Sequence, residues 1–188
     1  MPSRKITWRP LSKKTVFSTR VFTIQEITSK SPVETDHVFY ALDANDWVIV
    51  VPVLKKKNTN DRFLLVTQWR HGNASESIEF PGGVIDAGEN AKEAAGRELL
   101  EETGYKAGSL SLLASLSPNP AIMTNRCHIF LAEELENTFD CSPDDDEYIT
   151  TSSIPVHEVI QNMGHGKYTH GLMLSALFLY LQKKGVSV

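Results

Sequence analysis

The sequence is poor in cysteine. Only two cysteines occur in 188 residues, Cys127 and Cys141, and they do not form a Cys-x-x-Cys motif. Such a count and spacing give no sign of a disulfide framework or of a zinc site built from cysteine pairs. We therefore expect both side chains to be reduced thiols in a cytoplasmic protein.

The sequence also lacks an excess of positive charge. The formal net charge is −4 at pH 7, and the isoelectric point is about 5.9. No overall basic field would recruit nucleic acid or an anionic membrane, so we expect neither as a partner. If the substrate is an anion, its binding must come from a few local cations or from a metal ion.

Long hydrophobic runs are absent as well. The longest apolar stretch, "LMLSALFLYL" at 172–181, is far shorter than the roughly 20 residues that span a bilayer. The first residues, "MPSRKITWRP", carry positive charge without the apolar segment that a secretory signal requires. These features predict a soluble protein whose C-terminal helix is buried.

The length and 41% hydrophobic content fit one globular body with a small extension. Alternating apolar and polar residues predict an antiparallel pair of strands at 20–28 and 37–43. We expect residues 1–45 to form this N-terminal sheet and residues 46–188 to form a body of the α/β (α+β) class. Further strands are expected at 47–54, 62–69, 110–116, 126–135 and 148–154, and helices at 91–103, 155–163 and 169–185.

An acidic helix is the most informative segment. Glu98, Glu101 and Glu102 fall within about a quarter of the helix circumference. Like charges at i,i+4, as in Glu98 and Glu102, oppose a helix by about 0.2–0.5 kcal/mol, so a cation is expected beside them. The helix follows a tight bend at Gly82–Gly83, and Arg97 is within reach of Glu93 and Glu101.

A cluster of oxygen ligands without neighbouring cysteine or histidine favours a hard divalent cation. We therefore expect Mg²⁺, with Mn²⁺ as a possible substitute. The competing interpretation is a solvated acidic face. The joint presence of the glycine bend, the arginine and the three carboxylates argues for the metal.

This segment resembles the signature of the Nudix hydrolases, G-x5-E-x7-R-E-U-x-E-E-x-G-U, where U is a bulky aliphatic residue. Tyr105 stands at the last U position and is bulky without being aliphatic. The other signature positions match at the right spacing and are occupied by Gly83, Glu89, Arg97, Glu98, Leu99, Glu101, Glu102 and Gly104. The resemblance implies a mixed-sheet α/β/α sandwich, with a small antiparallel N-terminal sheet that forms a homodimer.

The resemblance also implies hydrolysis of a nucleoside diphosphate linked to another moiety X. Glu98 and Glu102 would be the leading metal ligands, and Glu101 would be a third ligand or a carboxylate that positions water. Arg97 would orient the carboxylates. Further roles are implied for the carbonyl of Gly82 as a ligand, for Glu89 as a weaker ligand candidate, and for Glu147 as the catalytic base, with Asp146 as its runner-up.

Residues around the signature point to ADP-ribose as the substrate. Pro120 stands 15 residues beyond Tyr105, as in the ADP-ribose subgroup. That subgroup also carries an arginine and an acidic residue where this chain has Arg70 and Glu79, which would bind substrate. The alternative interpretation of Arg70 is a strand-end arginine that pairs with Glu79. Ala121 and Asn125 depart from the usual pattern after the proline. GDP-mannose or another nucleotide-sugar is the alternative substrate, and a non-catalytic nucleotide sensor is the alternative class.

Overall fold

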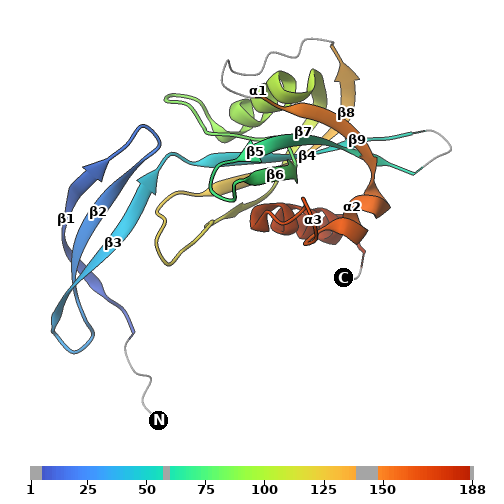
Figure 1. The fold of residues 1–188 in the computed structure, drawn as a ribbon. Helices are drawn as coiled ribbons and strands as arrows, with labels where there is room; N and C mark the ends of the chain where they lie inside the picture. The colour runs from blue at the N-terminus through green and yellow to red at the C-terminus, as the bar shows by residue number, and fades with distance from the viewer. Residues whose placement is uncertain (1–5, 57–59, 139–147, 187–188) are drawn as a thin grey trace. The chain divides into compact units, whose positions relative to one another are not determined.

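The computed structural model describes residues 6–56, 60–138 and 148–186 and divides into two compact units (Figure 1). The first unit comprises Met1–Asn45 together with Ser117–Arg126, and the second comprises Asp46–Leu116 and Cys127–Val188. The segment at 117–126 joins the first unit through two backbone hydrogen bonds, from Leu42 to Ile122 and from Thr124 to Leu42. Sequence patterns give no hint of this pairing because its partners lie about 80 residues apart.

The first unit contains a three-stranded antiparallel sheet in the order β1-β2-β3. The strands are β1 (Arg9–Ser18), β2 (Phe22–Lys30) and β3 (Asp36–Ala44). The predicted pair at 20–28 and 37–43 corresponds to β2 and β3, whereas β1 was not predicted. Every residue of β1 is exposed, and its bulges at Pro10/Ser12 and Thr15/Phe17 interrupt the strict alternation that sequence analysis relies on.

A six-stranded mixed sheet forms the centre of the second unit. Its strand order is β6-β5-β4-β8-β7, with β9 paired to β5, and β4 runs parallel to β8. β6 is a strand that the sequence patterns did not predict. The strands are β4 (Trp47–Leu54), β5 (Arg62–Arg70), β6 (Ser75–Glu79), β7 (Tyr105–Leu116), β8 (Cys127–Asn137) and β9 (Thr150–Pro155).

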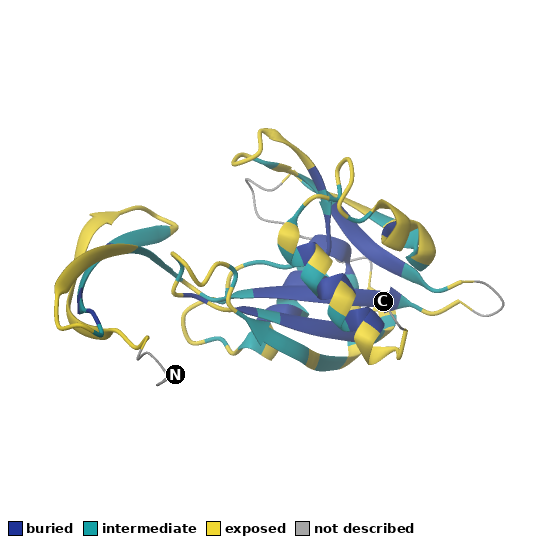
Figure 2. Ribbon diagram, turned by 90° about the horizontal axis from the view of Figure 1, so that it is seen from below, coloured by how far each residue is buried: buried dark blue, intermediate teal, exposed yellow. Residues whose placement is uncertain are grey.

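Helices cover both faces of this sheet, which confirms the predicted α/β/α layering (Figure 1). Helix α1 (Ala91–Thr103) packs on one face, and α2 (Val156–Asn162) and α3 (Gly171–Lys183) pack on the other. Figure 2 shows the buried residues concentrated on the strands of this sheet, and the buried residues of α1 and α3 include Leu99 and Leu177. Among the described residues, no helix is long and apolar enough to cross a membrane.

The predicted bounds of α1 are confirmed, because the sequence carries signals for both ends. The Asn90 side chain accepts hydrogen bonds from the backbone N–H groups of Lys92 and Glu93, and the Glu93 carboxylate accepts one from the Asn90 N–H. This capping box satisfies donors that would otherwise lack partners. At the other end Gly104 adopts the left-handed conformation, with φ of 70°.

Candidate active site

The glycine bend lies against β4 and faces α1. The Val50 N–H donates to the Pro81 carbonyl and the Val48 N–H to the Gly83 carbonyl, each at 2.9 Å. A Cβ atom on Gly82 would lie 2.2 Å from the Val48 carbonyl oxygen. Because that neighbour is backbone and cannot move aside, the position requires glycine. Within the described part of the chain, no group donates a hydrogen bond to the Gly82 carbonyl.

Two of the predicted metal ligands lie beside this bend. Glu98 is 9% exposed and Glu102 is 2% exposed. Glu102 Oε2 accepts a hydrogen bond of 2.8 Å from the Gly82 N–H. A Cβ atom on Gly83 would lie 2.3 Å from Glu98 Oε1, so the second glycine leaves the space that this carboxylate occupies. The structure therefore places Gly82, Glu98 and Glu102 together.

Arg97 organises the carboxylates around it. Its Nη1 donates hydrogen bonds of 2.9 Å to Glu98 Oε1 and to Glu101 Oε2. Its Nε and Nη2 donate to the two carboxylate oxygens of Glu89, each at 3.0 Å. These contacts, with the Glu89 hydrogen bonds as the largest contribution, raise the pKa of Arg97 above its ordinary value. Arg97 therefore stays cationic and holds three acidic side chains.

The predicted contact between Arg97 and Glu93 is wrong. The Glu93 carboxylate belongs to the capping box at the start of α1, and Arg97 turns to Glu89 in the preceding loop. Glu89 is eight residues before Arg97, so helical spacing alone does not predict this pair. The Arg97 hydrogen bond is the main cause that lowers the pKa of Glu89 below its ordinary value. Glu89 is thus a carboxylate that Arg97 holds in its ionised form.

Arg70 and Glu79 form a second polar pair of the site. Arg70 Nε and Nη2 donate hydrogen bonds of 2.9 and 2.7 Å to the two oxygens of Glu79. The Glu79 side chain is 1% exposed, whereas that of Arg70 is 42% exposed. Burial by itself raises the pKa of Glu79, but the bonds from Arg70 and Ser77 lower it overall. The buried carboxylate therefore orients an arginine that reaches the surface at the end of β5.

Three further residues complete the description of the site. His170, at the start of α3, places Nε2 4.0 Å from Glu79 Oε2, a neighbour that no sequence pattern indicated. Thr151 on β9 donates a 2.7 Å hydrogen bond from Oγ1 to the Glu102 carbonyl, which ties β9 to α1. Trp69 is 51% exposed, so it is a surface residue rather than part of the core.

Glu147 and Asp146, the proposed base and its runner-up, lie outside the described residues.

The residues of this site fit a hard divalent cation. In the described part of the chain, no three acidic, histidine or cysteine side chains are already arranged as a metal cluster. The observation that supports a cation is instead the burial of two carboxylates four residues apart on one helix, beside a backbone carbonyl with no described donor. Carboxylate and carbonyl oxygens are the ligands that Mg²⁺ prefers.

Cys127 is not part of this chemistry. It is buried in the core on β8, and it is a free cysteine. Burial raises the pKa of its thiol to about 12, so the side chain remains a neutral thiol. The prediction of a reduced Cys127 agrees with this environment. Cys141 lies outside the described residues.

Comparison with known proteins finds similar sequences that cover most of the chain. The sequence profile described as the NUDIX domain matches residues 46–172. The ADP compounds hydrolase NudE of Escherichia coli (strain K12) is 27% identical over 171 residues, which cover 90% of this chain and 89% of that protein. The ADP-ribose pyrophosphatase of Saccharomyces cerevisiae is 32% identical over 124 residues, or 63% of this chain and 54% of that protein.

A solved structure is similar to this chain over nearly its full length. The crystal structure of an ADP compounds hydrolase superposes with a TM-score of 0.83 at 26% sequence identity. The match covers 98% of this chain and 100% of the other. The likeness therefore includes the N-terminal three-stranded sheet as well as the mixed sheet that carries the acidic helix.

Proposed function

Because this chain belongs to the Nudix family of pyrophosphohydrolases, we propose that it hydrolyses ADP-ribose to AMP and ribose 5-phosphate in a Mg²⁺-dependent reaction. The observation that carries the proposal is the pairing of buried Glu98 and Glu102 against the Gly82–Gly83 bend. Nudix hydrolases generally use divalent metal ions. Among these residues Glu98, Glu102 and the Gly82 carbonyl would hold Mg²⁺, with Glu101 as a further ligand.

When bound, Mg²⁺ supplies charge neutralisation at the pyrophosphate and lowers the pKa of coordinated water. The protein's own residues hold the carboxylate ligands and the substrate in position. Arg97 fixes the Glu98 and Glu101 carboxylates, and the Gly82 N–H fixes that of Glu102, so these oxygens need little reorganisation at the moment of reaction. Arg70, oriented by Glu79, would bind a phosphate oxygen of the substrate through its guanidinium.

The choice of ADP-ribose rests on two kinds of support. Two of the similar proteins carry names that specify ADP compounds or ADP-ribose. In addition, the chain has Arg70, Glu79 and Pro120 at the positions that the ADP-ribose subgroup marks. If the chain hydrolyses a different pyrophosphate, GDP-mannose is the alternative substrate. If it is not an enzyme, the alternative function is nucleotide binding without turnover.

A substrate comparison tests the proposal directly. The purified chain is incubated with Mg²⁺ and with ADP-ribose, GDP-mannose or NADH, and the released AMP, GMP and sugar phosphate are quantified. We expect kcat/KM to be highest for ADP-ribose, and EDTA to abolish turnover. A higher kcat/KM for GDP-mannose would identify GDP-mannose as the preferred substrate and would leave the proposed pyrophosphate hydrolysis unchanged. Tight binding of ADP-ribose without product formation in Mg²⁺ or Mn²⁺ would contradict the proposed hydrolase and indicate a non-catalytic nucleotide sensor.

We also propose that the N-terminal sheet forms a homodimer. Its strands carry large apolar side chains that are about half exposed, among them Phe17 at 58%, Val38 at 52% and Tyr40 at 57%. Exposed apolar sheet surface of this kind is normally covered by another chain. A second copy is the expected cover, because homodimers with twofold symmetry are the commonest assemblies.

We expect Val38→Lys to convert the dimer to a monomer, because it places a charge on the apolar surface of β3. Val33→Lys is the matched control, since Val33 is 71% exposed in the turn between β2 and β3. Light scattering at micromolar concentration measures both variants and the unmodified chain. A stable monomer for the unmodified chain would remove the dimer proposal, and so would a dimer that survives Val38→Lys.

A further inference from the structure

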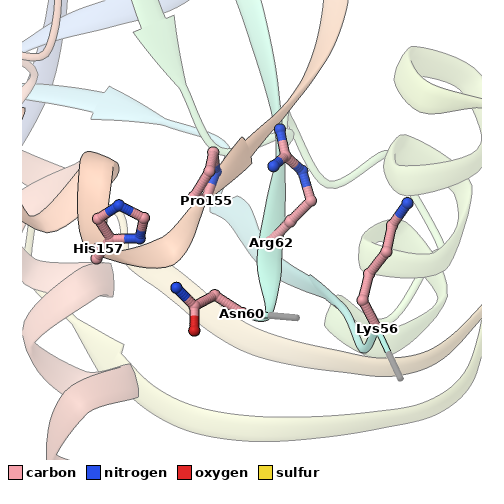
Figure 3. Close-up of a pocket in the computed structure, with 5 residues that line it drawn as sticks. All are labelled: Lys56, Asn60, Arg62, Pro155 and His157. Atoms are coloured by element: carbon pink, nitrogen blue, oxygen red, sulfur yellow. The ribbon is translucent and has the colours of Figure 1, made fainter. Parts of the chain in front are cut away.

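A pocket lies at the opposite end of β5 from Arg70. Its volume is about 370 Å³, and Figure 3 shows its lining residues coming from three segments: the chain between β4 and β5, β5 itself, and the junction of β9 with α2. The lining residues are Lys56, Asn60, Arg62, Pro155 and His157. We call this the Arg62 pocket.

The lining of the Arg62 pocket is basic. It contains a lysine, an arginine and a histidine, and none of the lining residues that the structure describes is acidic. The side chains of Lys56 and His157 make no hydrogen bond or ion pair with any other residue that the structure describes. The chain as a whole is acidic, with a net charge of −4, so a lysine and an arginine gathered in one hollow with no acidic side chain among its described lining residues are not a consequence of composition. Their mutual repulsion would be relieved by a bound anion.

Arg62 is held in a fixed orientation in this pocket. Its Nε donates a 2.8 Å hydrogen bond to Ser153 Oγ, and its Nη2 donates to the Ser153 carbonyl. Both contacts cross from β5 to β9. Of its three nitrogen atoms, Nη1 has no partner in the described part of the chain. A guanidinium that is anchored on one side and has donors on the other is suited to an oxyanion.

The Arg62 pocket is separate from the candidate active site. β5 rises about 3.3 Å per residue, so the eight steps from Arg62 to Arg70 separate the two backbone positions by about 26 Å. A ligand held by Arg70 and the acidic helix would not fill this pocket as well. Ligand pockets for small molecules start at about 300 Å³, so the pocket has room for a compact anion with a small organic group.

We propose that the Arg62 pocket binds a phosphate dianion, either free or as the phosphomonoester of a small molecule. A phosphate group offers three or four acceptor oxygens to the donors of Lys56, Arg62 and His157, and charge-assisted hydrogen bonds are the stronger class. The Asn60 amide supplies a neutral donor and acceptor for a hydroxyl on an attached group. Among the described residues of the lining, no acidic side chain opposes a dianion.

Titration without turnover tests this site independently of the proposed reaction. The full chain is titrated with inorganic phosphate and with ribose 5-phosphate in EDTA, at constant ionic strength set with chloride. NMR follows the ring resonances of His157, and calorimetry gives the affinity. We expect saturable shifts of His157. Tighter binding of ribose 5-phosphate identifies an organic phosphomonoester as the ligand, and equal binding identifies phosphate itself.

Variants distinguish the pocket from a general charge effect. We expect Lys56→Gln and His157→Gln each to weaken phosphate binding about tenfold, the scale of one lost charge-assisted hydrogen bond. Neither side chain has a partner in the described structure, so both variants should fold. Lys55→Gln is the matched control, because Lys55 pairs with Glu133 at 3.6 Å and does not line the pocket. An unmoved His157 resonance, or equal loss of affinity in Lys55→Gln, would overturn the proposal.

Discussion

Glu98→Gln and Glu102→Gln are each expected to lower the turnover of ADP-ribose by about 10³–10⁵-fold. A divalent cation contributes several kcal/mol to transition-state charge stabilisation, and about 4–7 kcal/mol corresponds to this range. Both carboxylates are nearly buried, and each is the type of ligand that Mg²⁺ requires. An amide keeps the size of the side chain but removes the charge that holds the metal.

The fold should survive both substitutions, for a reason visible in the hydrogen bonds. Glu102 accepts from the Gly82 N–H, and Glu98 accepts from Arg97, and the oxygen of a glutamine can accept in either place. Removing one charge also relieves the i,i+4 repulsion of about 0.2–0.5 kcal/mol between them. We therefore expect the melting temperature to change by no more than a few degrees.

Glu93→Gln is the matched control on the same helix. It removes one negative charge, while the capping box tolerates glutamine at this position. Turnover should stay within a factor of about two of the unmodified chain. Steady-state rates at limiting and saturating Mg²⁺ provide the measurement. If Glu98→Gln or Glu102→Gln retained near-normal turnover at limiting Mg²⁺, that residue would not be a metal ligand.

The acidic helix shows how far sequence reasoning reaches. Its bounds could be predicted because Asn90, Glu93 and Gly104 are local signals, each acting within a few residues. The gathering of Glu98 and Glu102 at the glycine bend follows from helical spacing plus the resemblance to a known signature. The pairing of Arg97 with Glu89 does not follow, because a loop sets their approach and no period describes a loop.

Long-range contacts explain most of what the sequence did not indicate. His170 reaches Glu79 across 91 residues, and Arg62 bonds to Ser153 across the same separation. Such pairs depend on how β5, β6 and β9 are ordered in the sheet, and a single sequence carries no direct record of that order. The strand β1 was missed for a different reason: its residues are all exposed, so burial imposes no pattern on them.

The second large effect is expected at the catalytic base. We expect Glu147→Gln to lower kcat by roughly 10²–10⁴-fold with little change in substrate affinity, the usual scale for general base catalysis. Water that attacks a pyrophosphate needs a carboxylate within hydrogen-bond reach. Glu98 and Glu102 are assigned to the metal, so the base should come from elsewhere. Glu147 precedes β9 by three residues, and β9 is tied to α1 by the bond from Thr151 to Glu102.

Glu101 is the competing base, and the structure defines its position. It is on the same helix as the metal ligands, its side chain is 38% exposed, and it accepts a 2.9 Å hydrogen bond from Arg97. The test compares Glu147→Gln, Glu101→Gln and Asp144→Asn, the last being a control for charge in the same acidic segment. Loss of a base should remove the acidic limb of the pH profile of kcat/KM as well as lower the rate. If Glu147→Gln keeps kcat and that limb while Glu101→Gln loses both, the base belongs to α1, and Arg97 then holds the base as well as the metal ligand Glu98.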